Sequence, residues 1–446
     1  MKVWWARLKE LRRYPSAVAG LLIIVVFMCI SIYTVIAIPY SEAIQLWQGG
    51  PGVWDENPKN ARPAWVDLFV KGTLPRTIVV RDKDEGTKRV EPLGEGQKRV
   101  EITLPFDYGY DGFPKELNLF LKASYEEQKP RVSILWRTPD GRTITLQEDR
   151  RVRPSDTYHI SQDGRLRLRL GMVAPEVGLF TDPTTEEHVP LKGRYELVIT
   201  GEFEETTDLE AKLVVYGQVH GLAGTDHLRR DLMIALLWGA PLAFAFGILG
   251  AVGAQVSTFV LAGIGTWFGG KVDGAFQRIT EVNMILPVLP ILMMIGMFYS
   301  RSIWLMLGLI ILLNVFSASM KTYRAMLLQA KESPYIEAAQ AYGAGNFRII
   351  FRYLLPRIVP TLLPQFILVI PSFVFLEASL AVIGLGDPVL PTWGKVLYDA
   401  RAQGALYMGH YYWVLEPSVL LMLTGFGFAL VGFTLDRVFN PRLRTI

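Results

Sequence analysis

The sequence predicts an α-helical membrane protein with six transmembrane helices and an inserted, β-rich, sandwich-like domain outside the cytoplasm. Three observations lead to this prediction. Half of the 446 residues are hydrophobic and 20% are charged, a balance that fits a membrane part joined to a water-exposed part. Long apolar spans flank one polar stretch, residues 41–222. Lys and Arg collect beside alternate connections between the spans, as is typical of cytoplasmic loops.

The first predicted helix covers residues 15–38, an apolar span of 24 residues that is long enough to cross the hydrocarbon layer of about 30 Å. A cleaved signal peptide is the alternative, but the span is long for one and no clear small-residue cleavage site lies near Pro39. We expect the helix to be retained with the N-terminus in the cytoplasm, because the preceding 14 residues hold five basic residues and one acidic one. The basic residues are Lys2, Arg7, Lys9, Arg12 and Arg13.

The polar stretch, residues 41–222, reads as a β-sandwich because turn signals separate short runs of strand-forming residues. The runs at 131–136 and 142–147 flank Thr-Pro-Asp-Gly and predict a hairpin. This stretch has no cysteine, and the single Cys29 lies in an apolar run, so neither an intrachain disulfide nor a cysteine-based metal site can form. The predicted strands are residues 99–104, 117–123, 131–136, 143–147, 166–170, 194–200 and 212–218.

Five further spans follow and bring the predicted total to six. If the N-terminus is cytoplasmic, the loop near Lys271, the segment 333–356 and the C-terminus are cytoplasmic too, while the loop near Arg301 and residues 386–411 are outside. We divide the chain into residues 1–40 (N-terminus and first helix), 41–222 (extracytoplasmic β-rich domain) and 223–446 (membrane core). The five spans are residues 241–268, 272–298 (with a kink expected at Pro287 and Pro290), 303–326, 358–385 and 412–435.

Between the fourth and fifth spans, residues 333–356 predict two short helices joined by a glycine elbow. Ser333 is placed to cap the first helix, Glu337 suits the positive end of its dipole, and Gly343 and Gly345 break it. On periodicity alone, an ordinary amphipathic connector between membrane helices fits equally well.

The second helix of this segment is expected to start at Asn346 as its cap and to end at Pro356. Its apolar residues repeat at i, i+3, i+4 and i+7 and predict one apolar face, made by Phe347, Ile350, Phe351 and Leu354.

The identities of the residues in this segment resemble the EAA loop of ABC importer permeases, in the version of the dipeptide/oligopeptide/nickel class. One departure is that Tyr353 stands where that family usually has Ile, with Leu354 following. In that family the loop forms a coupling helix that docks into a cleft of the ATPase subunit. The matching residues are Glu337, Ala338, Ala339, Gly343, Leu355 and Pro356.

Two further motifs resemble the same family. Residues 224–231, GTDHLRRD, match its GTDxxGRD signature at Gly224, Thr225, Asp226, Arg230 and Asp231, with Arg229 in place of the second glycine. Residues 377–394 follow its EASLSFLGLG…PSWG stretch, and Asp436 and Asn440-Pro441-Arg442 fit its usual ending. The resemblance covers about residues 5–40 and 222–444, and leaves 41–222 as an insertion. The third motif is carried by Glu377, Gly384, Gly386, Trp393 and Gly394.

The resemblance implies the ABC type I importer permease fold and a non-catalytic, multi-pass subunit of the plasma (cell inner) membrane. It implies uptake of peptides or a related small solute, such as a nickel complex or an oligosaccharide. It also implies four kinds of partner: a second and different permease subunit, two ABC ATPase subunits that hold ATP and magnesium, an extracytoplasmic substrate-binding protein, and membrane lipid. No cofactor is expected on this chain.

Other functional classes are disfavoured by particular residues. Residues 265–272 approach a phosphate-binding loop, but Val272 replaces the hydroxyl residue that would bind magnesium. The five histidines form no metal-ligand pair, and the basic residues form no stripe for nucleic acid. Two acidic residues in or near apolar spans, Glu281 and Glu377, are expected to make packing or interface contacts rather than to couple ions.

Two rival functions remain open at this point. An ion-coupled secondary carrier would work without ATPase partners, and an inverted repeat would be expected in its sequence. A membrane-anchored receptor would explain the outer domain but not five further spans. The outer domain itself is compatible with a docking platform for the binding protein, a ligand-binding module or a structural cap.

Overall fold

The computed structural model describes residues 14–439 except 71, 95, 127 and 186–187. The predicted features at Lys2, Arg7, Lys9, Arg12 and Arg13, and at residues 440–444, lie outside the described residues. The chain divides into a helical unit, Met1–Gln48 with Ile234–Ile446, and a β-rich unit, Gly49–Met233.

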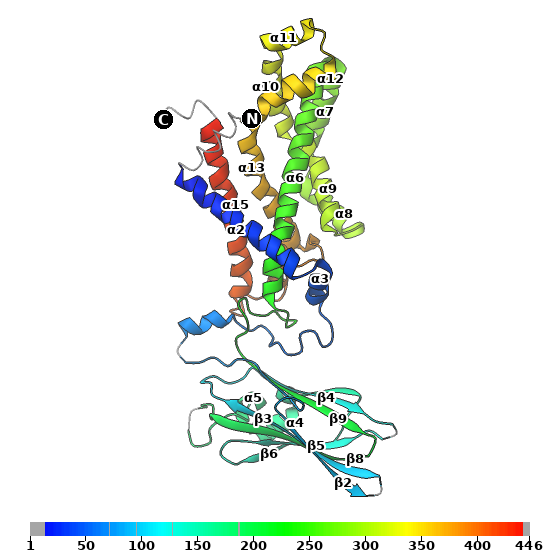
Figure 1. The fold of residues 1–446 in the computed structure, drawn as a ribbon, viewed down its shortest axis with the longest axis vertical. Coiled ribbons are helices and arrows are strands. Elements are labelled where there is room, and N and C mark those ends of the chain that lie inside the picture. Colours follow the sequence, from blue (N-terminus) through cyan, green and yellow to red (C-terminus); the bar gives the residue numbers. More distant parts are fainter. Residues whose placement is uncertain (1–13, 71, 95, 127, 186–187, 440–446) are drawn as a thin grey trace. The chain divides into compact units, whose positions relative to one another are not determined.

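Among its described residues, the helical unit contains four helical stretches that are long and apolar enough to cross a membrane, and two bent helix pairs that would bring the number to six (Figure 1). The four are Pro15–Ala37, Leu232–Phe268, Asn346–Leu385 and Tyr412–Val438. The helical membrane fold predicted from composition is therefore confirmed. Its helices are α2 (Pro15–Ala37), α3 (Tyr40–Gln48), α6 (Leu232–Phe268), α7 (Gly270–Ile285), α8 (Val288–Phe298), α9 (Ile303–Val315), α10 (Ala318–Lys331), α11 (Pro334–Ala341), α12 (Asn346–Arg348), η4 (Ile349–Leu354), α13 (Leu355–Leu380), η5 (Ala381–Leu385), α14 (Trp393–Ala402) and α15 (Tyr412–Phe439).

The two middle predicted spans are not straight. Helices α7 and α8 meet at 77°, with Pro287 at the break, so the kink expected from the prolines is confirmed. Helices α9 and α10 meet at 46° across residues 316–317, and no proline lies at this break to predict it.

Helix α15 packs closely against α2 and α13, and glycines permit this approach. A Cβ placed on Gly20 of α2 would lie 2.7 Å from the carbonyl oxygen of Gly427 in α15. One on Gly432 would lie 2.5 Å from a methyl carbon of Leu368 in α13.

The β-rich unit is built from two antiparallel sheets, with strand orders β1-β9-β4-β7 and β2-β3-β8-β5-β6 (Figure 1). The predicted hairpin is confirmed, because residues 131–137 pair with residues 143–151. The strands are β1 (Ile78–Arg81), β2 (Thr87–Gly94), β3 (Gln97–Tyr108), β4 (Glu116–Ser124), β5 (Arg131–Arg137), β6 (Thr143–Arg151), β7 (Ser155–His159), β8 (Gly193–Glu204) and β9 (Asp208–Tyr216). A short helix precedes them, η2 (Ala64–Phe69), and three lie between β7 and β8: η3 (Ile160–Gln162), α4 (Gly164–Arg169) and α5 (Pro175–Gly178).

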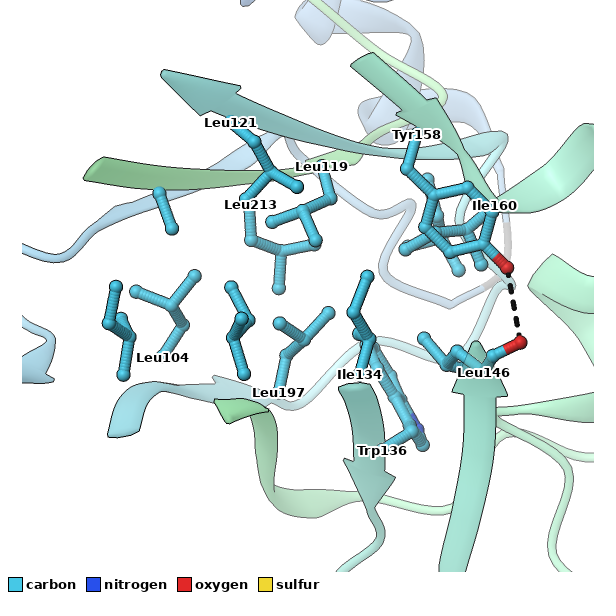
Figure 2. Close-up of a cluster of buried hydrophobic side chains, with 14 of the residues drawn as sticks. Leu104, Leu119, Leu121, Ile134, Trp136, Leu146, Tyr158, Ile160, Leu197 and Leu213 are labelled. Atoms are coloured by element: carbon cyan, nitrogen blue, oxygen red, sulfur yellow. Dashed lines mark hydrogen bonds between the residues drawn. The ribbon is translucent and has the colours of Figure 1, made fainter. Parts of the chain in front are cut away.

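The two sheets share one hydrophobic core, so the sandwich-like architecture predicted from the short runs between turn signals is confirmed. Figure 2 shows Leu119 and Leu213 of one sheet facing Leu197 and Ile134 of the other. Trp136 is fully buried in this core, 5.4 Å from the ring of Phe180 between centroids. This core holds the unit together without a disulfide.

Five of the seven predicted strands lie within β3, β4, β5, β6 and β8, the one at 212–218 extends two residues beyond the end of β9, and the one at 166–170 is wrong. That segment is helix α4, because the Asp163 carboxylate caps it by accepting hydrogen bonds from the backbone N–H groups of Arg165 and Leu166, at 2.9 and 3.1 Å. The alternating sequence Arg-Leu-Arg-Leu misled the prediction, since it fits a strand face as well as a short helix.

Candidate functional site

The segment 333–356 forms an elbow between α10 and α13, as the glycines predict. Gly343 adopts the left-handed conformation at φ +76° and ends α11 by donating its N–H to the Gln340 carbonyl at 2.9 Å. Gly345 stays at φ −66° and stands at the N-cap of α12. The expected side-chain caps are wrong in detail: Ser333 occupies the N-cap of α11 without a side-chain capping bond, and Asn346 is already inside the helix.

The prediction that Pro356 ends the second helix is also wrong. The chain widens into a π-helical segment over Ile349–Leu354 and runs on directly into α13. Proline lacks the N–H of a regular helical bond, and the wider π-helical turn directly before Pro356 accommodates the missing bond without ending the helix. The elbow is therefore continuous with a membrane-spanning helix on its C-terminal side.

Helix α11 has a buried face and an exposed face. Ile336 and Ala339 are buried, while Glu337 and Ala338 are exposed. Tyr342 follows at the end of the helix with 93% of its surface exposed. Of the three residues that match the Glu-Ala-Ala motif, Glu337 and Ala338 therefore face outward, and Ala339 packs the helix against the bundle.

The predicted apolar face of the second helix is split. Ile350 and Leu354 are buried, but Phe347 and Phe351 are 66% and 49% exposed, and Ile349 takes the inward position instead. The π-helical geometry rotates the side chains away from the spacing that a regular helix would give. We call the exposed set Glu337, Ala338, Tyr342, Phe347 and Phe351 the elbow surface.

The elbow is anchored to the bundle by one hydrophobic cluster. In this cluster Ile336, Ile350 and Leu354 of the elbow are buried together with Phe259 of α6 and Leu327 of α10. Burying several large aliphatic side chains stabilises this attachment by about 1.5–3 kcal/mol each, so the elbow and the ends of α6 and α10 form one rigid body.

Two charged side chains of α10 strengthen that body. The guanidinium of Arg324 donates to both carboxylate oxygens of Asp273 in α7, at 2.5–3.0 Å. The ammonium of Lys331 donates to the carbonyls of Thr266 and Trp267 at 3.0 and 3.1 Å, where α6 ends. Sequence reasoning missed both contacts, because their partners lie more than 50 residues away.

The second motif, Gly224–Asp231, lies in the β-rich unit and joins the start of that unit to its end. The Thr225 hydroxyl donates to the Pro58 carbonyl at 2.6 Å and accepts from the Ala61 N–H at 2.9 Å. The Asp226 carboxylate is buried and accepts from the Arg230 side chain at 2.5 Å. The motif thus has a structural role within the β-rich unit.

Arg229 stands where the second motif usually has a glycine, and its contacts show how an arginine is accommodated at this position. It adopts φ +67°, a strained conformation for a residue with a Cβ. Its guanidinium donates to Glu116 at 2.6 Å and to the Asn57 carbonyl at 2.7 Å, and lies 4.1 Å from the ring centroid of Tyr216. These contacts offset the strain.

Asp231, the last residue of the motif, faces His220 at 4.0 Å. Burial lowers the pKa of His220 and raises the pKa of Asp231, so the pair is held toward its uncharged forms.

The third motif fixes α14 against the bundle. Trp393 is buried and donates its indole N–H to the Leu236 carbonyl of α6 at 2.9 Å. Gly384 adopts φ +95° and ends the helical run, and a Cβ on Gly394 would lie 2.6 Å from that of Ala381. The positive φ therefore explains Gly384, and close packing explains Gly394.

The two acidic residues of the apolar spans differ. Glu377 is buried at the end of α13, in the third motif, which agrees with a packing role. Glu281 is half-exposed and lies 3.2 Å from Arg278 and 4.0 Å from Lys321. The near-match to a phosphate loop is a helix-to-helix turn with positive φ at Gly269 and Gly270. Within the described residues, no group of three His, Cys, Asp or Glu side chains is placed to hold a metal ion.

Comparison with known proteins identifies the membrane part of the chain. Residues 255–445 match the family model described as "Binding-protein-dependent transport system inner membrane component". The dipeptide transport system permease protein DppC of Bacillus subtilis is 28% identical over 224 residues, which is 50% of this chain and 68% of that protein. The oligopeptide permease protein OppC of the same organism is 27% identical, over 50% and 72%. The glutathione permease protein GsiD of Pectobacterium atrosepticum is 29% identical, over 50% and 73%.

Proposed function

We propose that this chain is the permease subunit of an ATP-driven peptide importer, because residues 255–445 match the family of inner membrane components of binding-protein-dependent transport systems. The elbow surface is the observation that carries the mechanism. It is exposed, mounted on a rigid body, and continuous with α13, so force applied there is passed into the membrane bundle.

The proposed topology has six membrane crossings, with each bent pair counted as one crossing. Both termini and the elbow are then cytoplasmic, and residues 49–233 are extracytoplasmic. The distribution of Lys and Arg supports this orientation, since Lys271, Arg324, Lys331 and Arg437 all fall at the predicted cytoplasmic ends.

The coupling step follows from the shape of the elbow. Ala338 is small enough to let α11 enter a cleft of an ATPase subunit, and the aromatic side chains of Tyr342 and Phe347 supply apolar contact area. When ATP closes the ATPase pair, α11 moves, and the contacts of Arg324 and Lys331 make α7, α10 and the end of α6 move with it.

The partners proposed for the complete transporter are two ABC ATPase subunits, a different permease subunit and an extracytoplasmic binding protein. ATP and magnesium bind to the ATPases, and this chain contributes neither a cofactor nor catalysis. Permeases that share half of this chain serve dipeptide, oligopeptide and glutathione transport, which supports a peptide as the solute. The β-rich unit, which lies outside the matched region, is proposed as the platform on which the binding protein docks.

Uptake by the reconstituted complex tests this proposal. Proteoliposomes that contain the chain, its partner permease, the ATPases and the binding protein should accumulate a labelled peptide only when ATP is present. Glu337→Lys should lower uptake while membrane insertion is unchanged, and Glu332→Lys, an exposed position just before the elbow, serves as the matched control. Uptake that follows a proton or sodium gradient and needs no ATPase would instead establish the ion-coupled carrier.

A further inference from the structure

An open-sided cavity of about 330 Å³, lined by both polar and apolar side chains, lies in the helical unit beside the break between α9 and α10. Half of its ten lining residues carry polar side chains, and none of the ten is charged. The size falls at the lower end of the range for small-molecule sites. The polar lining residues are Gln255 of α6, Asn314 of α9, Ser317 and Ser319 at the start of α10, and Ser372 of α13.

The helix break next to the cavity is held by side chains from two other helices. The Thr258 hydroxyl of α6 donates to the Val315 carbonyl at 2.8 Å. The amide of Asn283 in α7 donates to the carbonyls of Leu313 and Phe316 at 2.7 and 3.1 Å. These carbonyls lose their helical partners at the bend, so the unwound backbone is satisfied from outside its own helix. Non-helical backbone at membrane depth persists only where protein buries it or where it lines a wet cavity.

Gln255 gives the cavity a fixed hydrogen-bonding group. The residue is only 9% exposed, and its carboxamide oxygen accepts a hydrogen bond from the buried hydroxyl of Tyr323 in α10. That bond uses the carboxamide oxygen, so the hydrogen-bonding group that Gln255 has left to offer in the cavity it lines is its NH₂ donor. Holding a polar side chain at this depth of an apolar helix is costly unless the side chain has polar neighbours.

Helix α13 contributes a polar edge to the same region. Gln365, Ser372 and Ser379 recur every seven residues, and all three are exposed on this membrane-spanning helix. A polar stripe on such a helix favours water or another helix over lipid. Ser372 belongs to both the stripe and the cavity. The cavity therefore opens on a side of the bundle that suits a second subunit.

We propose that this cavity is one wall of the translocation pathway and that it takes the uncharged amide groups of a peptide backbone. The proposal rests on the peptide-import function above. Its lining offers an amide donor, an amide acceptor and three hydroxyl groups, which match the N–H and C=O groups of a peptide bond. It offers no charge that would select for one side chain over another, so peptides of varied sequence can pass.

Because Cys29 is the single cysteine of the chain, replacing it allows one reactive cysteine to be placed at each chosen position. In the complete transporter with Cys29→Ala, the variants Ser317→Cys and Ser372→Cys are exposed to a charged, water-soluble methanethiosulfonate reagent. Both should react at least tenfold faster than Leu312→Cys, a control on α9 that is 63% exposed but outside the cavity lining. Adding trialanine with the binding protein should slow the reaction at Ser317→Cys and Ser372→Cys. Rates equal to that of Leu312→Cys would overturn the proposal.

A second variant separates this proposal from the proposed function. Ser372→Leu fills the cavity edge without touching the elbow, and it should lower trialanine uptake at least fivefold while the ATPases still assemble with the chain. If the wild type and Ser372→Leu both take up trialanine normally, and the cysteines placed in the cavity do not react, the assignment of the cavity is overturned while the importer function stands. Absence of ATP-dependent uptake in the wild type would instead defeat the importer function. Reactive cysteines that trialanine does not protect would rule out a peptide as the ligand.

Discussion

Gly343 allows the account of the elbow to be tested with a single added methyl group. The residue sits at φ +76°, where a side chain strains the backbone, yet a Cβ there would meet no atom within 4 Å. The cost of Gly343→Ala is therefore purely conformational, about 1–2 kcal/mol. That cost lowers the equilibrium ratio of native to non-native elbow conformations by a factor of about 5–30.

Gly345→Ala is the matched control, because its Cβ also meets nothing within 4 Å while its φ of −66° suits any residue. Peptide uptake and binding-protein-stimulated ATP hydrolysis are measured in proteoliposomes for both variants. Gly343→Ala should lose most of its uptake and Gly345→Ala should keep it, with equal amounts of both in the membrane. Equal uptake by the two variants would refute the claim that the left-handed elbow transmits the coupling.

Three further predictions concern contacts away from the elbow surface. Arg229→Ala keeps the positive φ but loses the charged hydrogen bonds, so it should destabilise the full chain by about 1.5–3 kcal/mol, and Arg229→Gly should recover about 1 kcal/mol in thermal unfolding. Burial alone would raise the pKa of Asp163, but hydrogen bonds from Tyr158 and the backbone of α4 hold this pKa below the usual 3.8. The ionised Asp163 therefore stabilises the fold above about pH 4, and this stabilisation is lost as the pH falls through the lower pKa of the folded state. Asp163→Asn should make the stability of the chain depend less on pH in that acidic range. Arg324→Asp should lower uptake, and adding Asp273→Arg should restore part of it; a double variant no better than the single one would argue against the ion pair.

Much of the architecture follows from local sequence patterns. The apolar spans are long, and the sandwich strands alternate, as in β3, where Val100, Ile102 and Leu104 are buried in turn. The elbow is also local, because Gly343 needs no distant partner to adopt its conformation. These features depend on neighbours along the chain, so one sequence is enough to predict them.

Two other features, the helix break after α9 and the π-helical segment, were not predicted from the sequence. The break after α9 is stabilised by Asn283 and Thr258, which lie 33 and 57 residues away from their partners. A signal did exist, since Asn283 is a polar residue within an apolar run. The π-helical segment before Pro356 was missed because a regular helix was assumed, and it exposes Phe347 and Phe351.

Docking of an ATPase on the elbow surface is tested most directly by site-specific cross-linking. A p-benzoylphenylalanine is incorporated at Tyr342, which is 93% exposed, and at Tyr33 of α2 as a control that is 63% exposed. After illumination of the membrane complex, mass spectrometry identifies the captured protein. We predict that the probe at Tyr342 captures an ABC ATPase subunit and that the probe at Tyr33 does not. Capture of the ATPase from Tyr33 but not from Tyr342 would contradict it.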